Sequence, residues 1–97
     1  MRVLLDTNVV LDFVLARQPF FIEANEIFVR LQNNEFEAFV SAITPINVFY
    51  TTRKEKGRST AFLAIEELLK LVRITESNNR IFKKLLYFSQ GIVYVID

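Results

Sequence analysis

Cysteine and histidine are absent from the sequence, and glycine and proline occur only twice each among its 97 residues. Without cysteine the chain can form neither a disulfide framework nor a thiolate metal site, and without histidine it lacks the commonest general base and imidazole ligand. The scarcity of glycine argues against the glycine-rich fingerprint of a nucleotide-binding Rossmann domain. Any chemistry must therefore come from carboxylates, hydroxyls, amides or cations.

A strong excess of one charge and a long apolar run are missing as well. Twelve basic and eleven acidic residues give a net charge of +1, so nucleic-acid binding would need a local basic patch. Asp6, Asp12 and Arg17 interrupt the apolar N-terminal sequence, and no run approaches the length of a membrane span. We therefore expect a cytoplasmic protein without a membrane partner.

Large apolar side chains are abundant. Hydrophobic residues make up 52% of the chain, and they include ten Phe and three Tyr. A chain of this length supports one core, to which each aromatic side chain contributes a large buried area. The composition predicts a single domain over residues 1–97 with a Phe-rich core.

Short apolar runs alternate with amphipathic stretches along the chain. The expected strands are Arg2–Leu5, Glu37–Ser41, Leu71–Ile74 and Ile92–Ile96. The expected helices are Val9–Ala16, Phe20–Leu31, Ile46–Arg53, Ser59 or Thr60 to Lys70, and Asn78–Phe88. This order predicts an α/β fold whose parallel sheet gathers functional groups at the carboxyl ends of its strands.

Local signals add detail to two of the helices. Thr44 and Pro45 are expected to open the third helix as cap and first-turn residue, and Gly57 is expected to close it. In the fourth helix, one apolar face is expected to point inward; it comprises Phe62, Ile65, Leu68 and Leu69.

Asp6 carries the strongest functional signal, because an ionisable residue directly after a buried strand lies where open α/β folds bind ligands. Thr7 and Asn8 supply a hydroxyl and an amide at a helix N-terminus, which can orient the carboxylate and donate to an anion. The alternative is that Asp6 or Thr7 only caps the following helix. The residues themselves leave both interpretations open.

Two segments resemble motifs of the PIN-domain ribonucleases. LLDTNVVLDFVLAR, at residues 4–17, is similar to the first motif of this family, which includes the VapC-type toxins of bacterial toxin–antitoxin pairs. SAITPINVFYTTRK, at residues 41–54, resembles the second motif. The resemblance is strongest over residues 1–75 and implies a three-layer, Rossmann-like fold. Its central parallel sheet is expected to have about four strands, with helices on both faces.

The resemblance also implies a site in which carboxylates hold Mg²⁺ or Mn²⁺ for hydrolysis of an RNA phosphodiester. Asp6 matches the first metal ligand, and Asn47 stands where many members of the family carry an acid. Asp97 follows the last expected strand and would point toward Asp6 if that strand lies beside the first, which makes it the second expected metal ligand. Thr7 and Asn8 are expected to orient the site.

The sequence departs from the family pattern after Thr75. Where the family has an Asp/Glu-rich segment, this chain has Glu76 followed by Ser77 and two asparagines, so Glu76 would have to take the place of the acid. We interpret the chain as a PIN-like domain that is shortened or degenerate at its C-terminus.

Two other charged features have structural interpretations. Asp12 falls inside the first helix and is expected on its polar face rather than at the metal. The basic run Arg53–Arg58 is either a contact to an RNA backbone or a solvated helix end that complements the helix dipole.

The sequence thus predicts a metal-dependent, RNA-cleaving nuclease of the toxin type. Its expected partners are the RNA substrate, a cognate antitoxin protein and a second copy of the chain in a homodimer. The alternative is a catalytically defective PIN-fold protein that acts as a dimerisation or antitoxin-binding module through its Phe-rich helices.

Overall fold

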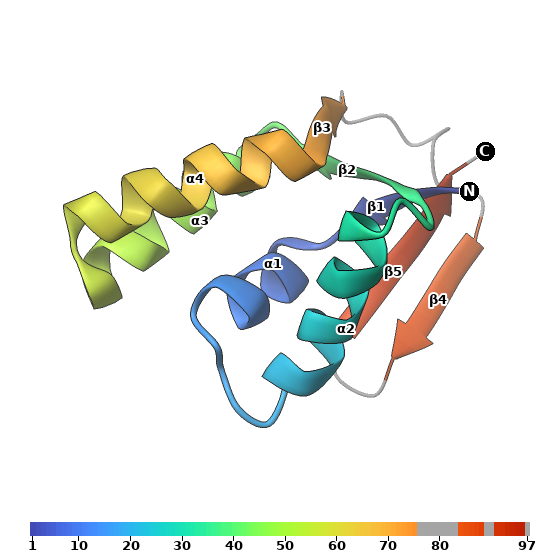
Figure 1. The fold of residues 1–97 in the computed structure, drawn as a ribbon, viewed down its shortest axis with the longest axis horizontal. Helices are drawn as coiled ribbons and strands as arrows, with labels where there is room; N and C mark the ends of the chain where they lie inside the picture. The colour runs from blue at the N-terminus through green and yellow to red at the C-terminus, as the bar shows by residue number, and fades with distance from the viewer. Residues whose placement is uncertain (76–83, 89–90, 97) are drawn as a thin grey trace.

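The computed structural model describes residues 1–75, 84–88 and 91–96 and shows helices packed against a twisted sheet (Figure 1). The strands are β1 (Arg2–Leu5), β2 (Glu37–Ser41), β3 (Val72–Thr75), β4 (Lys84–Phe88) and β5 (Gly91–Ile96). The helices are α1 (Thr7–Val14), α2 (Phe21–Gln32), α3 (Ile43–Lys56) and α4 (Arg58–Leu71). Up to Thr75 the order of strands and helices is therefore the predicted one.

The sheet has the strand order β3-β2-β1-β5-β4. Strand β1 pairs in parallel with β2, and β2 pairs in parallel with β3. Strand β5 lies beside β1 as expected, but it runs antiparallel to β1, and β4 runs antiparallel to β5. The α/β class and the parallel core are confirmed, although the parallel part has three strands rather than four.

The segment that follows β3 differs from the prediction. Lys84–Phe88 is a strand, whereas the spacing of apolar residues predicted a helix over residues 78–88, of which 78–83 lie outside the described residues. A short apolar run fits either structure, and here pairing with β5 stabilises the extended form, with Phe88 opposite Gly91. The predicted helix is therefore wrong for these five residues.

The core of the described residues is built mainly from aliphatic side chains. Val3 and Leu5 of β1 and Val40 of β2 are at most 2% exposed, and side chains from α1, α2, α3 and α4 join them in one cluster. Among residues 1–75, Phe28 is the one fully buried phenylalanine, and it stacks on Phe13 at 4.1 Å between ring centroids. The predicted Phe-rich core is wrong there, because most of the phenylalanines lie at its margin.

Helices α3 and α4 form a hairpin that projects beyond the sheet (Figure 1). Helix α4 buries Leu68 and packs Ile65 against the core, as predicted, but it also buries Ala61 and leaves Phe62 and Leu69 52% and 45% exposed. The predicted inward face is therefore confirmed for two of its four residues. The small Ala61 is completely buried, and the larger Phe62 takes the exposed position beside it. Within the described part of the chain, every helix is too short or too polar to cross a membrane.

Gly57 joins the two helices of the hairpin. It is the C-cap of α3, as predicted, and also the N-cap of α4, with φ +92° and ψ 168°. Its N–H donates to the carbonyl of Arg53 at 2.9 Å, and its carbonyl accepts from the N–H of Ala61 at 3.1 Å. Residues with a Cβ rarely adopt this backbone conformation, so the position requires glycine. The reason is the backbone and not a lack of space, because a Cβ here would meet no atom within 4 Å.

We therefore expect Gly57→Ala to lower the free energy of unfolding by about 1–3 kcal/mol, because alanine is strained at this backbone conformation. Urea unfolding followed by far-UV circular dichroism measures the change. Lys56→Ala, at the neighbouring exposed position, is the control and should change the stability by about 0.5 kcal/mol or less. Equal stability of the Gly57→Ala variant and the unsubstituted protein would contradict the expected strain.

Candidate functional site

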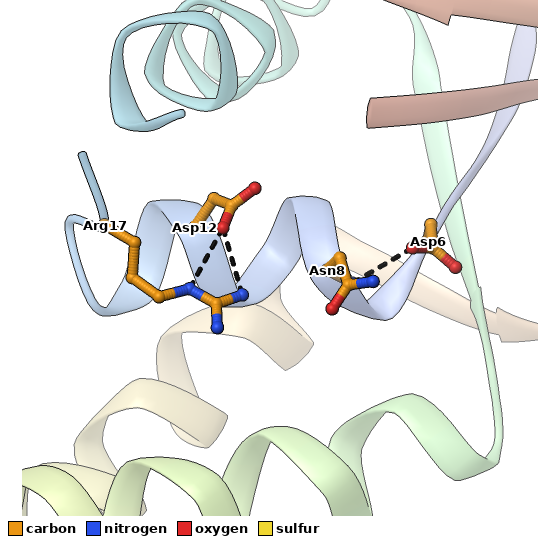
Figure 2. Close-up of polar contacts among 4 residues, drawn as sticks. All are labelled: Asp6, Asn8, Asp12 and Arg17. Carbon is orange, nitrogen blue, oxygen red and sulfur yellow. Dashed lines mark hydrogen bonds and ion pairs between the residues drawn. The ribbon is translucent and has the colours of Figure 1, made fainter. Parts of the chain in front are cut away.

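Asp6 lies between β1 and α1, at the sheet edge where the three parallel strands end. It is the N-cap of α1, and its Oδ2 accepts a hydrogen bond from the backbone N–H of Asn8 at 3.2 Å (Figure 2). Asp6, rather than Thr7, therefore caps α1. The second carboxylate oxygen makes no hydrogen bond to any described residue, and the side chain is partly exposed, so Asp6 can still bind a ligand.

Three hydroxyl groups connect this edge of the sheet to α3. The Oγ1 atoms of Thr7 and Thr44 lie 2.9 Å apart, and the Oγ of Ser41 lies 3.3 Å from Oγ1 of Thr44. Thr44 is 2% exposed and belongs to the first turn of α3, which begins at Ile43 rather than at the predicted Ile46. Its hydroxyl therefore ties the start of α3 to the residue after Asp6 instead of capping the helix.

The two asparagines of the predicted site are exposed. Neither Asn8 nor Asn47 makes a side-chain hydrogen bond with the described residues, and Asn8 contacts Asp6 through its backbone alone. Asn47 follows Thr44 by three residues on α3, so it lies within one turn of the Thr7–Thr44 hydrogen bond. Both amides are accessible to a ligand, whereas Thr7 is engaged with α3.

The remaining predicted acids, Asp97 and Glu76, lie outside the described residues. The strand that leads to Asp97 ends with Ile96 paired to Arg2, at the opposite end of β1 from Asp6. The expectation that the last strand ends beside Asp6 is therefore wrong, because β5 runs antiparallel to β1. Strand β3, which precedes Glu76, runs parallel to β2 and ends with Thr75 paired to Ser41, at the same edge as Asp6.

Asp12 is buried, whereas the sequence placed it on a polar face of α1. It is 5% exposed, and both Nε and Nη2 of Arg17 lie 3.0 Å from its Oδ1 (Figure 2). The side chain of Arg17 turns back along α1 to reach the carboxylate and is itself 37% exposed. Asp12 continues the buried run Val9–Leu11 of α1, so a charge at this position needs a partner.

The sequence contained a signal for this ion pair. Asp12 stands alone among apolar residues from Val9 to Ala16, and Arg17 is the first cation that follows it. A single acid within a wholly apolar helix is costly unless it is paired, so the nearest cation was the natural candidate. The Thr7–Thr44 bond gave no comparable signal, because the two residues are 37 positions apart.

The oxygen atoms near Asp6 fit one kind of metal site. The described residues contain no group of three acidic side chains that could enclose a cation. They do offer one carboxylate with an unbonded oxygen, next to exposed amides. Mg²⁺ commonly keeps several waters and is held by one or two carboxylates together with substrate phosphates. The donor set thus fits a hydrated ion shared with a phosphate and does not fit a cage formed by the protein alone.

The fold and the position of Asp6 define an α/β domain with an acid at the carboxyl edge of a parallel core. The profile of the PIN domain family matches residues 2–89, so the chain belongs to this family, and the match extends past Thr75. No curated protein sequence matches the chain significantly. Membership supports a nuclease-type function in general and a nucleic acid as the class of substrate.

Removing either partner of the Asp12–Arg17 pair should lower the stability, but by different amounts. Arg17→Met leaves a buried carboxylate without a partner and should lower the free energy of unfolding by about 3–5 kcal/mol. Asp12→Leu leaves only a partly exposed guanidinium, which water can solvate, so its cost should be smaller. The double variant should regain most of the stability that Arg17→Met loses.

Urea unfolding of the three variants and the unsubstituted protein measures these differences. Arg30→Met serves as the matched control, because Arg30 pairs with exposed carboxylates and such pairs contribute about 1 kcal/mol or less. If Arg17→Met and Arg30→Met lowered the free energy of unfolding equally, the buried Asp12–Arg17 pair would contribute no more to stability than an exposed pair.

Proposed function

We propose that the chain is a metal-dependent ribonuclease that cleaves an RNA phosphodiester at the sheet edge marked by Asp6. The observation that supports this most directly is the partly exposed Asp6 carboxylate at the carboxyl edge of the parallel strands, one oxygen of which makes no hydrogen bond within the described part of the chain. The family membership of the chain supports the same class of reaction.

Each group near Asp6 has a proposed role in binding and orientation. Asp6 holds the cation, which when bound activates water and neutralises phosphate charge. The first N–H groups of α1 and the amide of Asn8 donate to a phosphate oxygen at the helix N-terminus. Asn47 contributes an amide from α3, and the hydrogen bond between Thr7 and Thr44 fixes the position of α3 relative to Asp6.

A second carboxylate is expected to complete the metal site. Glu76 is the stronger candidate, because it follows a strand that ends at the Asp6 edge. Asp97 follows a strand whose last described residue is at the opposite edge, so it is the weaker candidate. Substituting Glu76 and Asp97 one at a time shows which of them is the second carboxylate.

Cleavage of a labelled, structured RNA with Mn²⁺ or Mg²⁺ tests the proposal. Asp6→Asn should reduce cleavage by about a hundredfold or more, because asparagine still caps the helix but offers no charge to the cation. Glu66→Gln, which changes an exposed acid on α4, should leave the rate within about twofold. Chelation by EDTA should abolish cleavage in every active variant.

The outcomes separate the possible ligands. A large loss in Glu76→Gln with little change in Asp97→Asn supports the site at the carboxyl edge, and the reverse result supports Asp97. Equal cleavage by the unsubstituted protein and Asp6→Asn would overturn the nuclease proposal. Purification of both proteins through the same steps excludes a contaminating ribonuclease as the source of a difference.

A second function is favoured by a separate surface. An apolar cavity of about 390 Å³ lies between α1, α2 and α4; its lining includes Phe13, Phe21, Phe28, Leu68 and Leu71. Ile22 of α2 is also 70% exposed. Such a cavity fits an apolar side chain of a protein partner, which supports the alternative of a binding module for an antitoxin.

Self-association is a further proposal that can be measured directly. We expect a homodimer, because the exposed apolar side chains on the described helices give this small domain much unburied apolar surface; they include Ile22, Ile43, Ile46, Phe62 and Leu63. Size-exclusion chromatography with light scattering should give twice the chain mass of 11.4 kDa. A mass equal to one chain at every concentration would contradict the dimer.

A further inference from the structure

The outer face of the α3–α4 hairpin combines exposed cations with exposed aromatic rings. Four cations, Arg53, Lys54, Lys56 and Arg58, surround the turn at Gly57, and Glu55 is the only acid among them. The chain as a whole has a net charge of only +1, so the residues outside this turn carry a net negative charge. The positive charge of the molecule is therefore concentrated at the tip of the hairpin.

None of these four cations forms an ion pair with the described residues, and all four are exposed. The cations that do pair among the described residues are Arg17, Arg30, Lys70 and Arg73. Charges left unpaired so close together repel one another, and an anionic partner would relieve that repulsion. Three of the cations lie in the last turn of α3, where the negative end of the helix dipole partly offsets their repulsion. This is one of the two interpretations of the basic run that the sequence left open.

Aromatic rings lie beside these cations in a fixed arrangement. Tyr50 and Phe62 are 60% and 52% exposed, and Phe49 lies between them in edge contacts at 5.5 and 5.0 Å between centroids. The guanidinium of Arg58 lies 5.5 Å from the centre of the Phe62 ring. Two partly exposed rings are thus held in place by a third, with a cation over one of them.

The same face of α3 leads from the hairpin back to the candidate site. Asn47, Tyr50 and Lys54 follow one another at spacings of three and four residues, so they lie on one exposed stripe of the helix. At 1.5 Å per residue, Lys54 lies about 15 Å farther along α3 than Thr44. Because Thr44 is bonded to Thr7, the stripe starts next to Asp6 and ends among the cations.

We propose that this stripe and the hairpin tip bind single-stranded RNA, with phosphates on Lys54 and Arg58 and an unpaired base on Tyr50. The inference rests on the proposed function, because it assigns a path to the substrate that would reach Asp6. The bound strand follows the outer face of α3 from Asn47 to the tip.

Single-stranded RNA fits this surface better than the other anionic partners. Clustered cations hold phosphates irrespective of sequence, and exposed aromatic rings stack on bases that are not paired. A duplex keeps its bases inside, so it could use the cations but not Tyr50. An acidic peptide could likewise use the cations, but it offers no flat base for the exposed rings.

Fluorescence anisotropy of the full chain with a labelled single-stranded RNA, in EDTA and over a range of salt concentrations, tests the proposal. Lys54→Gln/Arg58→Gln should lower the affinity by about tenfold and reduce the slope of log K against log salt by about 1.4. The matched control, Arg30→Gln/Lys70→Gln, removes two charges that pair on the protein and should change the affinity by less than about twofold.

A second pair of variants tests stacking. Tyr50→Leu should weaken RNA binding by about tenfold, whereas Tyr50→Phe, which keeps the ring, should retain the affinity. Circular dichroism melting of every variant separates loss of binding from loss of folding.

Equal RNA affinity in the hairpin variant and its control would overturn the proposal. Binding of polyglutamate with the same affinity and the same dependence on Lys54 and Arg58 would also overturn it and indicate an acidic peptide instead. Because the measurement is made in EDTA, RNA binding that depends on the hairpin would support this inference even if the cleavage assay rejected the nuclease. Conversely, cleavage that depends on Asp6 without any role for the hairpin would reject only this inference.

Discussion

Burial of the apolar side chains on both sides of Asp6 is the constraint on which the rest of the structure depends. Val3 and Leu5 precede the turn, Val9 and Val10 follow it, and all four are at most 3% exposed. The carboxylate cannot move away from the sheet edge unless part of this apolar cluster returns to water, at roughly 25 cal/mol for each Å² exposed. The core therefore holds Asp6 in place, and the helix cap only sets its orientation.

The fold could be predicted from sequence wherever local chemistry decided the structure. The bounds of β1 and β2 agree with the prediction, because each is a short apolar run that ends at polar residues. Gly57 ended α3 as expected, because few other residues adopt its backbone conformation. Lys84–Phe88 could not be assigned in this way, because its structure is decided by pairing with β5 and its apolar spacing suits a helix equally well.

In the candidate site, too, the features set by local sequence could be predicted and those set by the packing of distant segments could not. Asp6 was found because it follows a strand directly, whereas the linkage of Thr7 to Thr44 depends on how distant segments pack. The direction of β5 was missed because the segment before it was predicted to be a helix crossing to a parallel strand, whereas that segment contains β4, which pairs antiparallel with β5. The face of α4 was predicted only in part, because apolar spacing does not tell which turn of a helix extends beyond the core: Leu68 is buried, whereas Phe62 remains 52% exposed.

The pairing of β1 with β5 has a consequence for how the protein assembles. Arg2 pairs with Ile96, so the ladder between β1 and β5 joins residues that are far apart in the sequence. Contacts of such long sequence separation slow folding, because the intervening loop loses its freedom before the contacts form. During synthesis, β1 has an open edge until β5 emerges from the ribosome, and an open edge can pair with another copy of the chain. Pairing with β5 closes this edge of β1 in the folded protein.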